Sequence, residues 1–222
     1  MSFAQQLLDG EKEIRALITT HPFVQGLADG TLPVERFRFY MAQDYVFLVE
    51  YGRIWGLAVA KARDLPTMRK LGQLLHSTLE VEMDLHRSYA AEFGVTKQEL
   101  ETTEPAPATH AYTRHLLNVA WSGSLAEILG SLLPCQWGYW ELASEMAAQG
   151  KAISSNPYQE WIKAYSAPEY GDLVRWLRDS FDSLVEGARP EDLTRVGREF
   201  ATSIRYELMF WKMAWSFVPK SQ

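Results

Sequence analysis

Three predicted helices each carry one reactive or ionisable side chain in the middle of an otherwise apolar stripe. These side chains are Asp44, Cys135 and Glu207, and Cys135 is the only cysteine of the chain. A thiol becomes a nucleophile only as the thiolate, which requires a nearby base or a positive field. If the three groups converge, sulfur can add to an electron-poor heteroaromatic ring while a carboxylic acid protonates a ring nitrogen.

Each of these groups also has a structural interpretation. A free cysteine on an apolar face is usually a small buried hydrophobe. A carboxylate on such a face is unfavourable unless it is paired, so Asp44 is either matched by a neighbouring arginine or lysine or held for a ligand. A later run of charged residues predicts a solvated face or a subunit contact rather than a metal site. That run comprises Glu80, Glu82, Asp84, His86 and Arg87.

The stripes follow the helical repeat of three and four residues, which lines side chains up on one face. The first contains Phe37, Tyr40, Asp44, Phe47, Tyr51, Ile54 and Ala58. The second contains Leu125, Ile128, Leu132, Cys135, Tyr139, Leu142 and Met146. The third contains Leu193, Val196, Phe200, Ser203, Glu207, Phe210, Ala214 and Phe217. Pro134 removes a backbone hydrogen bond and predicts a kink near Cys135.

The rest of the chain also favours helices, so the predicted fold class is all-α, in a single domain over residues 1–222. Further helices are expected over residues 3–19, 66–93 and 108–121, with a short helix after Gly150 and another through Val185. Residues 21–33 are rich in turn signals and predict no longer element. Ser124 is expected to cap the Cys135 helix.

Composition narrows the class of protein. The chain has 222 residues, and 22 Lys and Arg against 28 Asp and Glu give a net charge of −6. No dense basic block is present to neutralise phosphates, so nucleic acid is not an expected partner. No secretion signal and no apolar run long enough to cross a bilayer is evident. A lone cysteine cannot form an internal disulfide, which fits a cytoplasmic location.

Aromatic side chains would wall the space between the stripes. Phe47, Tyr51, Tyr139 and Phe210 lie on the same faces as the three ionisable groups. A cavity lined by rings with a few polar groups is typical of a small-molecule site. A planar nitrogen heterocycle would stack on the tyrosines and offer Asp44 an amidine-like edge for two hydrogen bonds.

The sequence resembles the TenA family, thiaminase II or aminopyrimidine aminohydrolase, of the cysteine-bearing bacterial type. The motifs are QDYVFL around Asp44, HAYTRHL around Tyr112, LLPCQWGYWE around Cys135 and YELMFWKMAW around Glu207. The resemblance covers essentially the whole chain. It implies an all-α, haem-oxygenase-like multi-helix bundle that assembles as a homotetramer.

The resemblance also implies roles for individual residues. Cys135 would be the nucleophile, Glu207 the acid and base, and Asp44 the group that grips the aminopyrimidine. The side chains that shape the pocket would be Phe47, Tyr112, Tyr139, Tyr165 and Phe210. Some members of the family have tyrosine where Phe47 stands, so a hydroxyl that could orient Glu207 is missing from this chain.

The implied reaction is hydrolysis at the methylene carbon attached to the pyrimidine. The substrate would be 4-amino-5-aminomethyl-2-methylpyrimidine and, more slowly, thiamine, and the product the hydroxymethylpyrimidine used in thiamine salvage. No metal and no organic cofactor is implied.

Two alternatives remain open from sequence. The first is a haem-oxygenase-like protein that binds haem or an iron pair, because a shared fold does not fix function. The early histidine His21 keeps this alternative open. No histidine follows a glutamate by three positions, which is the di-iron signature. The other alternative is a non-catalytic protein that binds pyrimidines.

Overall fold

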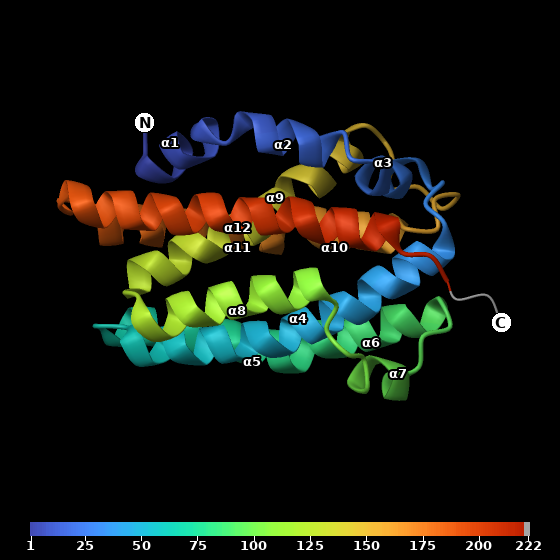
Figure 1. Ribbon diagram of the computed structural model, residues 1–222, viewed down its shortest axis with the longest axis horizontal. Helices are drawn as coiled ribbons and strands as arrows, with labels where there is room; N and C mark the ends of the chain where they lie inside the picture. The colour runs from blue at the N-terminus through green and yellow to red at the C-terminus, as the bar shows by residue number, and fades with distance from the viewer. Residues whose placement is uncertain (220–222) are drawn as a thin grey trace. The chain divides into compact units, whose positions relative to one another are not determined.

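The computed structural model describes residues 1–219, and their regular structure consists of helices (Figure 1). This confirms the all-α class. Contacts within the chain divide it into two compact units. Unit 1 contains residues 1–33 and 129–215, and unit 2 contains residues 34–128 and the described residues from Ser216 onward. The single domain over residues 1–222 stays a prediction.

Unit 1 is built from both ends of the chain. Its helices are α1 (Phe3–Gly10), α2 (Lys12–Thr19), α3 (Pro22–Asp29), most of α9 (Leu125–Ala148), α10 (Gln159–Ser166), α11 (Pro168–Val185) and α12 (Pro190–Ser216). The Ala4 amide donates to Asp182 Oδ1 at 2.8 Å and thereby ties α1 to α11. Arg15 on α2 pairs with Glu141 on α9 at 2.7 Å. The N-terminal helices are thus attached to helices formed much later in the sequence.

Unit 2 is centred on its longest helix. Its elements are α4 (Val34–Lys61), α5 (Leu65–His76), the π-helical turn η1 (Ser77–Glu82), α6 (Met83–Glu92), α7 (Lys97–Glu101), α8 (Pro107–Ser122) and the first residues of α9. The long helix α4 packs against α5, η1, α6 and α8. Glu50 on α4 forms an ion pair with Arg114 on α8, with 3.0 Å between oxygen and nitrogen, and links these two helices.

The turn-rich segment at residues 21–33 contains a helix that the sequence analysis missed. The His21 side chain accepts from the Phe23 amide, Pro22 occupies the first helical position, and Gly30 ends α3 with a φ of 72°. Histidine, proline and glycine in this order are start and stop signals of a short helix. They had been interpreted as turn signals, which was wrong.

Two predicted helices are interrupted. The helix expected over residues 3–19 breaks at Glu11, which separates α1 from α2. The helix expected over residues 66–93 is continuous in direction but contains η1. By contrast, the cap of α9 is confirmed, because Ser124 Oγ accepts from the Glu127 amide at 3.3 Å and Glu127 Oε2 accepts from the Ser124 amide at 2.8 Å.

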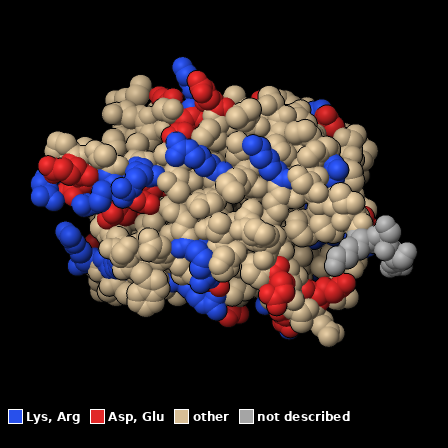
Figure 2. Space-filling model, viewed as in Figure 1, with Lys and Arg blue, Asp and Glu red and all other residues tan. Residues whose placement is uncertain are grey.

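Charged side chains of both signs are interspersed on the face in Figure 2, where uncharged residues separate small groups of blue and red. This agrees with the absence of a dense basic block in the sequence. None of the helices within residues 1–219 combines the length and apolar content that crossing a bilayer requires.

Candidate active site

Unit 1 carries five of the eight predicted site residues: Cys135, Tyr139, Tyr165, Glu207 and Phe210. Cys135 lies in the middle of α9, directly after Pro134, and is half-buried. Tyr139 follows one helical turn later and lies on the same face.

Tyr139 is the centre of an aromatic cluster in unit 1. Its ring centroid lies 4.9 Å from that of Tyr165 and 5.2 Å from that of Trp211. The Trp161 ring lies 4.8 Å from Tyr165 and 5.6 Å from Tyr139. Trp161 on α10 was not expected to take part from the sequence, since it lies outside the three predicted stripes. Rings packed at these distances form a rigid apolar wall.

Glu207 lies on α12, which packs against the cysteine-bearing helix α9. The Tyr139–Trp211 contact joins α9 to α12, and both helices run in the same direction (Figure 1). Cys135 precedes Tyr139 by one turn, and Glu207 precedes Trp211 by one turn. Glu207 is 5% exposed, so its carboxyl group is removed from bulk solvent beside the cysteine-bearing helix.

Unit 2 carries the other three predicted residues, and it brings them together. Asp44 is 7% exposed on α4, and Phe47 follows one turn later on the same helix. The Phe47 ring centroid lies 5.2 Å from that of Tyr112 on α8 and 5.7 Å from that of Tyr51. One acid beside stacked rings is the arrangement expected for one side of a site for a flat heterocycle.

The partner of Asp44 is a histidine, neither an arginine nor a lysine. His86 Nε2 on α6 lies 3.3 Å from Asp44 Oδ2, without the alignment of a hydrogen bond. The charged run that contains His86 is therefore not simply a solvated face. Asp84 is exposed, but His86 is buried and Glu82 is half-buried. The run alternates between solvent and the interior of unit 2.

The pKa of Glu82 departs clearly from its ordinary value. Burial, together with the negative charge of Asp44, raises the pKa of Glu82 from 4.5 to about 7. The two carboxyl groups lie close enough to repel each other when both are ionised. Below about pH 7 Glu82 is therefore protonated and uncharged.

Glu82→Gln is expected to remove a pH dependence of the free energy of unfolding. Between pH 4.5 and about 7 the folded protein keeps a proton on Glu82 that the unfolded chain has lost. Stability therefore falls as pH rises through this window and is constant above it. The loss is at most about 3.5 kcal/mol, because each pKa unit corresponds to about 1.4 kcal/mol.

Denaturant unfolding of both proteins at about pH 5 and about pH 8 measures this difference. The variant should gain stability relative to the unmodified protein at the higher pH. Glu80→Gln, on the exposed side of the same turn, is the matched control. It should leave the free energy of unfolding unchanged at both pH values. Identical pH dependence in the Glu82→Gln and unmodified proteins would contradict this assignment.

Gln43, the residue before Asp44, positions α8 and was not recognised in the sequence. Its Nε2 donates to the Glu104 carbonyl at 3.1 Å. Its Oε1 accepts from the Ala106 amide at 2.8 Å and from Thr109 Oγ1 at 2.7 Å. These bonds fix the first turn of α8, and Tyr112 lies one turn beyond Thr109. A buried glutamine on a helix that faces an irregular segment is the signal that could have identified it.

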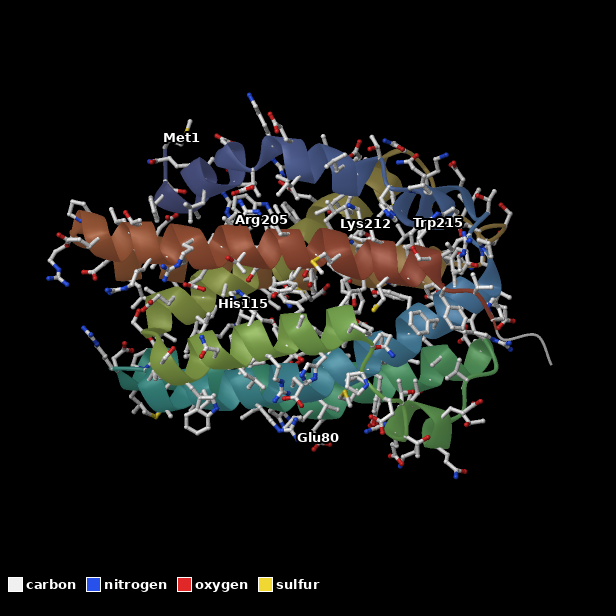
Figure 3. The ribbon with its side chains drawn as sticks, in the orientation of Figure 1. Met1, Glu80, His115, Arg205, Lys212 and Trp215 are labelled. Carbon is white, nitrogen blue, oxygen red and sulfur yellow. The ribbon has the colours of Figure 1, made fainter. Side chains whose placement is uncertain are left out.

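His21 has a structural role in unit 1. Its Nδ1 accepts from the Phe23 amide at 3.3 Å and caps α3. Burial, and secondarily the charge of Lys212 on α12, lowers the pKa of His21; Figure 3 labels Lys212. Within residues 1–219, no three His, Cys, Asp or Glu side chains are arranged to hold a metal ion.

Comparison with known proteins gives consistent matches. The family model "TENA/THI-4/PQQC family" matches residues 10–216. An aminopyrimidine aminohydrolase of Halalkalibacterium halodurans is 41% identical over 216 residues, which cover 97% of this chain and 96% of that protein. A TenA homologue from P. horikoshii has a TM-score of 0.90 at 34% identity and covers 97% of this chain and 99% of that one. A domain from Shewanella denitrificans with a heme oxygenase-like fold has a TM-score of 0.71 at 16% identity, over 95% of this chain and 89% of that one. This likeness confirms the predicted fold.

Proposed function

Because the chain belongs to the TENA/THI-4/PQQC family, we propose that it is an aminopyrimidine aminohydrolase, a hydrolase of C–N bonds in thiamine salvage. Its substrate is 4-amino-5-aminomethyl-2-methylpyrimidine and, more slowly, thiamine. The observation that carries this proposal is the 41% identity, over 97% of the chain, to a relative named for that activity.

In the proposed reaction the Cys135 thiolate adds to the pyrimidine ring while Glu207 supplies a proton to a ring nitrogen. Ammonia then leaves from the aminomethyl carbon, and an exocyclic methylene group forms. Water adds to that methylene, the ring loses the sulfur, and the proton returns to Glu207. In total one C–N bond breaks, one C–O bond forms, and one water is consumed for each ammonia released.

The remaining residues bind and orient the substrate. Asp44 accepts hydrogen bonds from the amidine-like edge of the pyrimidine, for which a carboxylate is a strong partner. Phe47 and Tyr112 offer ring faces beside Asp44. Tyr139, Tyr165 and Phe210 form the apolar wall near Cys135 and Glu207, and the rings reduce access of water to the sulfur.

The finer features of the protein follow from the same family assignment. We infer a single domain over residues 1–222, because the family model spans residues from both compact units. We infer a homotetramer from the resemblance to the family alone. A cytoplasmic location without nucleic acid partners fits the absence of a dense basic block and the single free cysteine. No cofactor enters the proposed chemistry.

The decisive experiment is an activity assay of the purified protein. We expect ammonia release from 4-amino-5-aminomethyl-2-methylpyrimidine and slower thiazole release from thiamine, both followed by chromatography of the hydroxymethylpyrimidine product. Pyrimidine binding without turnover would identify a non-catalytic binding protein. A haem protein would be recognised by its visible absorption, which an aminopyrimidine site does not produce.

A further inference from the structure

One helical turn in unit 2 departs from the repeat of the helices around it. The helix α5 ends at His76, α6 begins at Met83, and η1 between them is a π-helical turn. A π-helical turn closes hydrogen bonds between residues i and i+5, so it holds one residue more than an α-helical turn. Every residue after it is displaced by one position on the helix surface.

The displacement exchanges two neighbouring side chains between solvent and interior. Leu71 and Thr78, which are two α-helical turns apart, are both buried. The same repeat would next bury Leu85. Instead, Leu85 is 58% exposed and His86 is 7% exposed. Exposing a leucine while burying a histidine is unfavourable for packing alone, which suggests a functional origin for the turn.

The neighbouring helix α4 is shaped to accept this turn. A Cβ atom on Gly52 would lie 2.9 Å from Leu79 Cδ2, so α4 lacks a side chain where η1 comes closest. Asp44, two turns earlier on α4, is the residue that faces His86, with Nε2 and Oδ2 3.3 Å apart. Within residues 1–219, neither ring nitrogen of His86 makes a hydrogen bond to another group. A small ring rotation would direct Nε2–H at the carboxylate.

We propose that η1 serves to place His86 against Asp44, and that His86 is a positioning residue that fixes the Asp44 carboxylate for the amidine-like edge of the pyrimidine. This inference rests on the proposed function. Once the ring has rotated and Nε2–H donates to Oδ2, the carboxylate can no longer rotate freely, and Oδ1 is left to accept from the substrate. A carboxylate that is oriented before the substrate binds loses less entropy on binding. We therefore expect His86 to raise the affinity for the substrate.

The test compares His86→Leu with the unmodified protein in steady-state kinetics. We expect KM for the aminomethylpyrimidine to rise about tenfold, as for the loss of one hydrogen bond to a charged group. We expect kcat to change less than about threefold, because His86 does not touch the reacting atoms. His86→Gln, which retains an N–H donor near the position of Nε2, should restore most of the affinity. His76→Leu on the exposed side of α5 is the matched control and should leave both constants unchanged.

A second ligand separates positioning from a general structural effect. A pyrimidine that lacks the 4-amino group cannot form the paired contact with Asp44, so His86→Leu should bind it as tightly as the unmodified protein does. Deletion of Glu80, an exposed residue of η1 (Figure 3), should restore the α-helical repeat and turn Leu85 inward. That variant should show the same increase in KM as His86→Leu.

Each result has a distinct meaning. An active unmodified protein whose KM is unaffected by His86→Leu would overturn the positioning role and leave the proposed function intact. Equal weakening of both ligands would also overturn it. An unmodified protein without any turnover would instead refute the proposed function. If His86→Leu does not fold, His86→Asn replaces it, because this side chain is polar but too short to reach Oδ2.

Discussion

Cys135→Ala is expected to abolish ammonia release from the aminomethylpyrimidine, with a loss in kcat of at least about a thousandfold. The reason is that sulfur forms the covalent bond that activates the ring. The fold should be retained, because alanine is the best helix former and Cys135 is only half-buried on α9. Ammonia assays and far-ultraviolet circular dichroism measure the two outcomes.

The covalent step can be observed separately from turnover. Mass spectrometry of rapidly quenched reactions should show a substrate adduct on the unmodified protein and none on Cys135→Ala. Cys135→Ser should also be nearly inactive, because a hydroxyl is a weak nucleophile at its ordinary pKa. Substantial activity in a folded Cys135→Ala protein would eliminate the covalent mechanism.

Glu207→Gln is expected to lower kcat by about two to four orders of magnitude, which is the usual contribution of a positioned acid or base. Glutamine has nearly the same shape but cannot transfer a proton. KM should therefore change little, because the substrate is held by Asp44 and the aromatic rings. The pH profile of kcat should also lose the limb that reports the glutamate.

Glu191→Gln provides the control for this substitution. Glu191 lies in the exposed first turn of the same helix, α12, and should be replaceable without kinetic effect. If Glu207→Gln kept the full kcat, another group would have to transfer the proton. A large increase in KM alone would assign Glu207 to binding instead of proton transfer.

Much of this fold is predictable because apolar stripes determine which helix faces are buried. Asp44, Cys135 and Glu207 were recognisable for the same reason, since a polar group on such a stripe is conspicuous. The all-α class and the cap at Ser124 followed from local sequence alone. These features depend on neighbours within one or two turns, which sequence periodicity reports directly.

The features that were missed depend on contacts between distant segments. The turn η1 shifts the helix by a single residue, and its Leu79 side chain packs against Gly52 on another helix. His86 is buried only through that shift, because the spacing of Leu71 and Thr78 would next bury Leu85. The Gln43 side chain forms its hydrogen bonds with groups between Glu104 and Thr109, about sixty residues later in the chain.

The interleaved composition of the two units has a consequence for how the protein is made. Residues 34–128 are contiguous, so this segment can begin to fold while the ribosome is still translating the remainder. The helices α1 and α2 are synthesised before this segment, yet their partners on α11 and α9 are synthesised only after it. The faces of α1 and α2 that these partners cover therefore stay exposed until then. We expect nascent chains stalled near Ile128 to bind chaperones through these two helices.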